Sequence, residues 1–221
     1  MFDIEESRGR EEGANGYKDS LIPFTRWITP MGVPKRFTTQ MYIYFLPLTQ
    51  TSAKHISSEA VIPVPTSDGG LEHTAALFAS CKEWLDQATR NDIILFPPQF
   101  YLMSLLSPFL DVSSLSNLST EELQRQRDGV LKFLNGDGDG KGVKWAEKVI
   151  SPIGLLMRKS DGRSVLALDK PGPELKDSGR RGDEKRVVLV KFSKEGPRNV
   201  EVRLRKDILD EDHAAAKDAK I

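Results

Sequence analysis

Acidic and amide side chains alternate with glycine at residues 135–140, before Lys141 and Gly142, which is the pattern in this chain closest to a metal-binding loop. A calcium-binding EF-hand loop requires oxygen ligands at alternate positions around a glycine and a glutamate at its twelfth position. A loop that starts at Asn135 has Ala146 at that position, and one that starts at Asp137 has a lysine there. Because Glu147 is one residue out of register in both cases, the pattern favours a flexible turn that ends a helix over a calcium site.

The histidines and the single cysteine have no spacing that is typical of a catalytic or metal site. No two of His55, His73 and His213 stand at the separation of zinc ligands. Cys81 falls on the expected inner face of a helix, so packing is favoured over work as a nucleophile. A single cysteine also excludes an intramolecular disulfide, which fits a reducing compartment.

Opposite charges balance over the whole chain, with 32 Lys and Arg against 32 Asp and Glu. Such a chain has no overall field to attract nucleic acid or an anionic membrane, so any anion site must be local. Residues 1–17 contain no apolar run of a signal peptide, and prolines interrupt the longer apolar stretches well short of the roughly 20 residues of a membrane span. We therefore expect an intracellular protein without nucleic-acid or membrane partners.

The last three residues, Ala219, Lys220 and Ile221, have the small, basic and aliphatic order of a peroxisomal import signal. The standard form of that signal is Ser-Lys-Leu, which the peroxisomal import receptor binds. The tripeptide predicts a peroxisomal location, with an ordinary polar tail of a cytoplasmic protein as the alternative.

Local patterns predict a strand followed by helices in the first two thirds of the chain. Residues 39–48 are aromatic, β-branched and almost continuously apolar, which predicts a central strand buried on both faces. Residues 72–78 predict a further strand. Ser80, the pair Pro97 and Pro98, and Ser119 are residues that favour helix starts. The three predicted helices span residues 80–90, 99–110 and 119–134.

The last third of the chain is different, because its apolar residues form short runs of strand length. These runs, at residues 164–168, 186–192 and 199–204, predict a small sheet. A segment rich in proline, glycine and charge at 169–184 predicts a mobile loop or linker. The expected organisation is a disordered or truncated entry at 1–20, a partial domain at 21–135, a Gly/Asp-rich linker with a short helix at 136–150, a β-rich extension at 151–206 and a polar tail at 207–221.

Several ordered segments between residues 21 and 110 carry a family resemblance. They are a predicted turn, Arg26-Trp27-Ile28-Thr29-Pro30, then Arg36-Phe37-Thr38-Thr39 with the aromatic strand after it, Glu72, Trp84 with Ala88, and Pro97-Pro98-Gln99-Phe100-Tyr101-Leu102. In this order they resemble segments of the Nudix hydrolases related to the peroxisomal coenzyme A diphosphatases. The family has Asp where this chain has Thr38, and Thr where this chain has Gln99.

The resemblance implies a mixed α/β fold, a Nudix-like α/β/α sandwich that is incomplete here and carries the small C-terminal sheet as an extension. It also implies a hydrolase that cleaves a diphosphate in coenzyme A, an acyl-coenzyme A or another nucleotide derivative. Magnesium or manganese ions held by carboxylates would neutralise the phosphate charge and activate the attacking water.

In that family the carboxylates come from the box Gly-x5-Glu-x7-Arg-Glu-U-x-Glu-Glu-x-Gly-U, where U is aliphatic. The N-terminal part of this chain contains one Arg-Glu pair, Arg10-Glu11, and the opening glycine of the box would then fall before Met1. Glu12 also stands where an aliphatic residue is required. The simplest interpretation is that the chain begins after the box, as a truncated or a diverged family member. We expect no hydrolysis by this chain, and a non-catalytic nucleotide-binding or interaction module is the alternative function.

Without the box, the resemblance leaves few residues to which a role can be assigned, and the catalytic residues are unknown. Arg36 is the candidate for a phosphate contact, because a guanidinium presents a planar fork to oxyanions. Phe37, Tyr42 and Tyr101 are the candidates for lining a substrate pocket, and Glu72 is a possible outlying metal ligand. The alternatives are structural roles, an ion pair for Arg36 and core positions for the aromatic residues. A missing strand and helix would bare an apolar edge, so a homo-oligomer is also expected.

Overall fold

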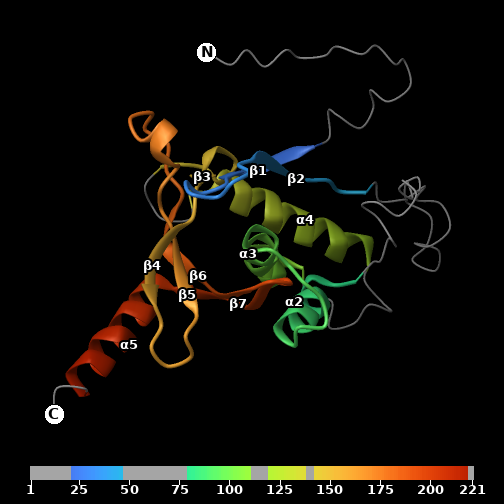
Figure 1. The fold of residues 1–221 in the computed structure, drawn as a ribbon. Coiled ribbons are helices and arrows are strands. Elements are labelled where there is room, and N and C mark those ends of the chain that lie inside the picture. The colour runs from blue at the N-terminus through green and yellow to red at the C-terminus, as the bar shows by residue number, and fades with distance from the viewer. Residues whose placement is uncertain (1–20, 47–78, 111–118, 138–141, 219–221) are drawn as a thin grey trace, which may run out of the picture.

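The computed structural model describes residues 21–46, 79–110, 119–137 and 142–218 of the 221-residue chain (Figure 1). These residues form a three-stranded sheet in the order β2-β1-β3, a four-stranded sheet in the order β4-β5-β6-β7, and helices. The mixed α/β class predicted from the sequence is therefore confirmed. Within the described residues, no helix has the length and apolar character that crossing a membrane requires. The strand predicted at 72–78 lies outside these residues.

The first sheet is built around β1 (Ile22–Ile28), which pairs antiparallel with β2 (Thr38–Ile43) and parallel with β3 (Val149–Ile150). The sequence predicted a turn in the β1 segment and a central, fully buried strand at 39–48. In the described part of the sheet the positions are reversed, since β2 lies at an edge and is partly exposed while β1 is central.

A shift in the pairing register explains how β1 contains a proline and still buries several side chains. The pairing register of β1 with β2 shifts between Pro23 and Arg26. A bulge of this kind tolerates a residue without an N–H and changes the alternation of side chains. Phe24 and Trp27, which are three residues apart, are therefore both buried against the core. Arg26 is left on the outer face of the sheet.

The three predicted helices are present, although the second begins and ends earlier than predicted. They are α2 (Cys81–Thr89), α3 (Pro97–Leu106) and α4 (Thr120–Asn135). Ser80 and Ser119 cap α2 and α4 by accepting hydrogen bonds from the first-turn amides of Glu83 and Glu122. Pro108 lies in the short 3-10 helix η1 (Ser107–Phe109), which follows α3 directly.

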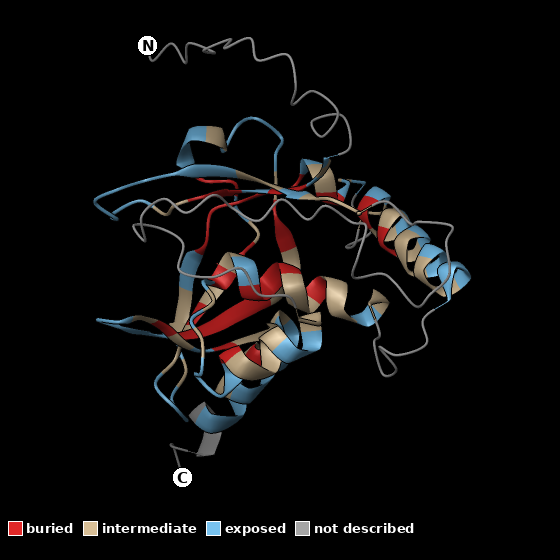
Figure 2. Ribbon diagram, turned by 90° about the vertical axis from the view of Figure 1, so that its right-hand side faces the viewer, coloured by how far each residue is buried: buried red, intermediate tan, exposed pale blue. Residues whose placement is uncertain are grey.

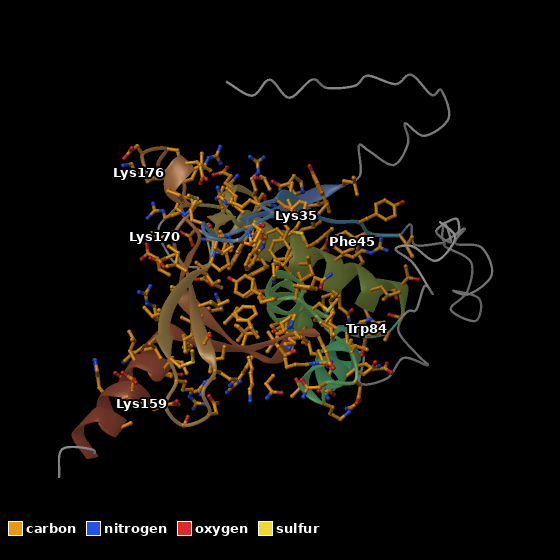
Figure 3. The ribbon with its side chains drawn as sticks, viewed as in Figure 1. Lys35, Phe45, Trp84, Lys159, Lys170 and Lys176 are labelled. Carbon is orange, nitrogen blue, oxygen red and sulfur yellow. The ribbon has the colours of Figure 1, made fainter. Side chains whose placement is uncertain are left out.

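The end of β2 is fixed against α4. Arg127 of α4 donates a hydrogen bond to the carbonyl oxygen of Leu46, and its guanidinium lies 5.4 Å from the ring centre of Phe45. Figure 3 shows Phe45 beside α4. The glycine-rich segment after α4 ends the helix as predicted, because Gly136 donates its backbone N–H to the carbonyl oxygens of Lys132 and Phe133. Residues 138–141 lie outside the described part.

The second sheet is an antiparallel meander that contains the three strands predicted from the sequence. Its members are β4 (Ile153–Met157), β5 (Ser164–Leu168), β6 (Asp183–Ser193) and β7 (Gly196–Leu204). The sequence pattern had not indicated β4. The helix α5 (Arg205–Asp218) follows β7, although a polar tail was predicted from 207 onward. Its buried Ile208 packs against Val165, Val187 and Leu189.

The helix α3 lies between the two sheets in Figure 1 and contacts both of them. Tyr101 of α3 meets Trp27 of β1 edge to face, with 5.5 Å between their ring centres. One apolar cluster contains these residues together with Val188 and Val190 of β6, so the ranges 21–135 and 151–206 share a core. Figure 2 shows the buried positions concentrated in this central region. The α/β/α sandwich expected from the resemblance stays a prediction.

The segment between β5 and β6, predicted to be a mobile linker, is held to β3 and to Ser151, which follows β3. Lys170 accepts a hydrogen bond from the backbone N–H of Ser151 at 2.8 Å, and Arg181 accepts one from Val149 at 3.1 Å. Gly182 is buried and donates to the carbonyl oxygen of Asp169 at 3.0 Å. Its short helix η4 (Pro173–Leu175) is thereby placed beside the turn that joins β1 to β2.

Candidate functional site

The turn between β1 and β2 is closed by hydrogen bonds between Thr29 and Phe37. The backbone N–H of Thr29 donates to the carbonyl oxygen of Phe37 at 2.9 Å, and the backbone N–H of Phe37 donates to Oγ1 of Thr29 at 3.0 Å. Gly32 has a φ of 87° within this turn, a conformation that glycine adopts without strain. The turn therefore holds the neighbouring Arg36 in a defined position.

Arg36 connects this turn to η4, 138 residues further along the chain. Its Nε donates to the carbonyl oxygen of Thr29 at 3.0 Å, and its Nη1 forms an ion pair with Oε1 of Glu174. The hydrogen bond that Arg36 donates to Glu174 raises the pKa of Arg36 above its ordinary value, and the same bond lowers the pKa of Glu174. Both side chains are partly exposed, so water and small ions can reach the pair.

A cleft of about 290 Å³ lies around this ion pair. The outer face of the β1–β2 hairpin forms one wall and η4 forms the other. Its lining residues are Arg26, Ile28, Arg36, Phe37, Thr38, Glu174 and Leu175. Two of these residues are cationic and one is anionic, which leaves an excess of one positive charge.

Arg26 supplies the unbalanced charge. Its Nε donates to Oε1 of Gln40, its partner across the strand pair, at 3.3 Å. Among the described residues no carboxylate lies within ion-pair distance of Arg26. A guanidinium held at the wall of a cleft without a counter-charge favours an anionic ligand.

Phe37 gives the cleft an apolar rim. Its side chain is 64% exposed although it is a large aromatic residue. Exposed aromatic rings beside cationic groups are suited to stacking on a planar ring such as a nucleobase. Figure 3 shows Lys35 on the same turn, and Lys170 and Lys176 on the loop that carries Glu174. Phe37 therefore adds an apolar face to a cleft that is lined by the two guanidinium groups of Arg26 and Arg36.

The structure brings together two of the four residues that the sequence nominated for substrate binding. Arg36 and Phe37 both line the cleft. Tyr42 is 51% exposed on β2 beside Pro23 and is not among the lining residues. Tyr101 is 0% exposed and donates a hydrogen bond to Asp183, so it belongs to the core. Glu72 lies outside the described residues.

Sequence reasoning missed Arg26 and Glu174 as members of the site. Arg26 stood in a segment that was interpreted as a turn, and its strand register with Gln40 would have placed it on the outer face. Glu174 had no local signal, because its segment is placed beside the cleft by hydrogen bonds to Val149 and Ser151, which are distant in the sequence.

The described residues do not fit the metal ion that the resemblance implies. Over the ranges 21–46, 79–110, 119–137 and 142–218, no three side chains of His, Cys, Asp or Glu are grouped to hold a cation. Cys81 is also unsuited to nucleophilic chemistry, because burial raises the pKa of its thiol. The arrangement of Arg26, Arg36 and Phe37 in the cleft is suited to holding an anion beside an aromatic ring.

Comparisons with models of protein families, with curated proteins and with solved structures found no match to this chain.

Proposed function

We propose that this chain is related to the Nudix hydrolases of coenzyme A and nucleotide diphosphates, and that its Arg26–Arg36 cleft binds the phosphates of such a ligand. The observation that carries the proposal is the cleft itself, in which two guanidinium groups face one carboxylate. The ordered segments between residues 21 and 110 support the relationship to the family. Two of those segments, the Arg-Trp-x-Thr-Pro and Arg-Phe-x-Thr runs, supply five of the lining residues: Arg26, Ile28, Arg36, Phe37 and Thr38.

The ligand class follows from the shape and charge of the cleft. A guanidinium binds phosphate oxygens through parallel hydrogen bonds, and a phenyl ring stacks on a base. The volume of about 290 Å³ is just below the roughly 300 Å³ at which the usual range of ligand pockets begins. The cleft thus accommodates the phosphates, and the base of the ligand lies outward against Phe37.

Thr38 strengthens the case for an anion. The family to which the chain is similar has Asp at this position, and here the residue lines the cleft without a charge. An aspartate would cancel the excess positive charge that Arg26 provides. Its replacement by threonine supports a site that binds a phosphate group directly.

Hydrolysis needs a group of carboxylates around a metal ion, and the described residues offer none. We therefore assign binding to this part of the chain and derive no chemical step for it. The alternative from the sequence, a binding module without catalysis, agrees with the geometry of the cleft.

The binding proposal is tested by isothermal titration of ADP and of coenzyme A into the purified 221-residue chain. Arg36→Gln removes a charged hydrogen-bond donor and should weaken binding by about tenfold or more. Arg90→Gln is the matched control, because Arg90 is an exposed arginine that pairs with Asp92 at the end of α2. Equal affinity of the Arg36→Gln variant and the parent chain would contradict the assignment of the cleft.

Catalysis is tested separately by incubation with an acyl-coenzyme A and magnesium. We expect no release of adenosine 3′,5′-bisphosphate. Turnover that a chelator abolishes would show that this chain is an enzyme. A loss of that turnover in Arg36→Gln would then show that the cleft serves the reaction.

The expected peroxisomal location and the homo-oligomer stay predictions. The tripeptide Ala219, Lys220 and Ile221 lies outside the described residues. Fusion of this C-terminus to a fluorescent protein, with a variant that lacks the tripeptide as the control, tests the import signal. Size-exclusion chromatography tests the oligomer, and elution as a monomer would contradict it.

A further inference from the structure

We infer that Glu174 is an internal competitor for the ligand, which occupies the guanidinium of Arg36 until a phosphate displaces it. The inference rests on the proposed function, because it concerns the same cleft. It goes further by assigning a regulatory role to a residue of η4. In the structure the carboxylate of Glu174 stands where the proposed phosphate would meet Arg36.

The contacts of Arg36 allow such an exchange without loss of the site. Its Nε is held by the carbonyl oxygen of Thr29, and its Nη1 is held by Glu174. Within the described residues its Nη2 makes no hydrogen bond. When Glu174 leaves, the bond to Thr29 still fixes the guanidinium, and two nitrogen atoms become available to one phosphate.

Glu174 can leave at little cost. Among the described residues its ion pair is with Arg36 alone, and the carboxylate is close to half exposed. The side chain can therefore turn into water without burying a charge. Exposed ion pairs of this kind contribute little net stability, because water and salt compete with them.

A phosphate gains more from the cleft than Glu174 does. Within the described residues Glu174 forms an ion pair with one cation, Arg36, whereas a phosphate in the cleft would have both Arg36 and the unbalanced Arg26 beside it. A phosphate also carries more charge and more acceptor oxygens than a carboxylate. The cleft should therefore admit phosphates and resist singly charged carboxylates, since these gain little from replacing Glu174.

The experiment compares ADP affinity by isothermal titration at pH 7 in the full-length chain and its variants. Glu174→Gln keeps the shape of the side chain and releases Arg36, so ADP should bind about two- to fivefold more tightly. Asp177→Asn is the matched control. It removes the same charge from the same loop, its side chain is 87% exposed, and its partner is Lys176.

The double variant Arg36→Gln with Glu174→Gln distinguishes competition between Glu174 and ADP for Arg36 from the general effect of removing a negative charge near the ligand. If Glu174 acts by occupying Arg36, its substitution should have no more effect than Asp177→Asn when Arg36 is absent. A gain from Glu174→Gln that equals the gain from Asp177→Asn, or that persists without Arg36, would overturn the inference. Binding of ADP by the parent chain in either case would leave the proposed function standing. Failure of both the parent chain and Glu174→Gln to bind ADP would overturn both proposals.

Discussion

Tyr101 and Asp183 are joined by a hydrogen bond of 2.6 Å from the phenol to the carboxylate, in the interior between α3 and β6. Neither residue is exposed by more than 1%. Asp183 also accepts hydrogen bonds from Nη1 of Arg186 at 3.0 Å and from the backbone N–H of Lys185 at 2.9 Å. The buried carboxylate is thus compensated by three donors, as a charge away from water must be.

The variant Tyr101→Phe should therefore destabilise the protein. It removes one donor from Asp183 and leaves a carboxylate oxygen in the interior less well compensated. We expect the free energy of unfolding to fall by about 1–3 kcal/mol in a urea titration. Tyr42→Phe is the control, because Tyr42 is exposed on β2. Equal losses of unfolding free energy in the two variants would show that the buried hydrogen bond does not stabilise the protein.

Helix starts fixed by contacts between residues close in the sequence were predicted correctly, whereas the position of β1, fixed by contacts between distant residues, was not. The starts of α2 and α4 were recognisable because Ser80 and Ser119 bond to amides three residues away. The position of β1 was missed because its central place depends on pairing with β3, more than 100 residues further along the chain. Residues 26–30 were interpreted as a turn, and the register shift that accommodates Pro23 is a property of the paired sheet.

The site shows the same division. Arg36 and Phe37 were nominated from a local pattern, and both line the cleft. Glu174 lies in a segment whose composition is typical of a mobile linker. Its position is set by hydrogen bonds of that segment to Ser151 and Val149, which no local pattern reveals. The residue type of Tyr101 did not reveal whether it lines a pocket or lies in the core, because its core position depends on the hydrogen bond to the distant Asp183.

Gly182 is predicted to tolerate no side chain. A Cβ at this residue would lie 1.9 Å from the carbonyl oxygen of Leu168 and 3.0 Å from Cγ1 of Ile150. Gly182→Ala therefore forces the two backbone segments apart and should lower the free energy of unfolding by about 1–3 kcal/mol or more. Gly154→Ala in β4 is the control, since no atom lies within 4 Å of its added Cβ. A similarly small change in both, measured by thermal denaturation, would contradict the close approach.

Asn91 is predicted to stabilise the junction of α2 with β7 through its backbone conformation and its side chain. It has a φ of 63°, its Nδ2 donates to Oδ1 of Asn199 at 2.8 Å, and its Oδ1 accepts from the backbone N–H of Asn199 at 3.1 Å. Asn91→Ala should cost about 1–3 kcal/mol, because alanine is strained at this φ and loses both bonds. Asn91→Gly relieves the strain and should recover part of the loss.

A suitable control for the Asn91 variants is Asn135→Ala. Asn135 lies in the last turn of α4, and among the described residues its amide bonds to the carbonyl oxygen of Leu131 alone. Urea denaturation of the variants would measure the difference. If Asn91→Ala and Asn91→Gly were equally destabilised, the strain at this residue would be negligible and the side-chain bonds would account for the whole effect.

The attachment of α5 is predicted to weaken in acid. Glu211 accepts hydrogen bonds from Nη2 of Arg158 at 2.8 Å and from Nη2 of Arg203 at 2.6 Å, and these bonds lower its pKa, the one from Arg158 first. A carboxylate whose pKa is lower in the folded state stabilises that state fully above its ordinary pKa of 4.5, and the contribution is lost as the pH falls through the lower, folded value. In Glu211→Gln this contribution is absent at every pH.

The difference in unfolding free energy between the parent chain and Glu211→Gln should therefore shrink as the pH falls from about 6 to about 3. At neutral pH it should also shrink with added salt, because the pairs are partly exposed. A difference that stayed constant across the titration would mean that Glu211 does not hold α5 through its charge.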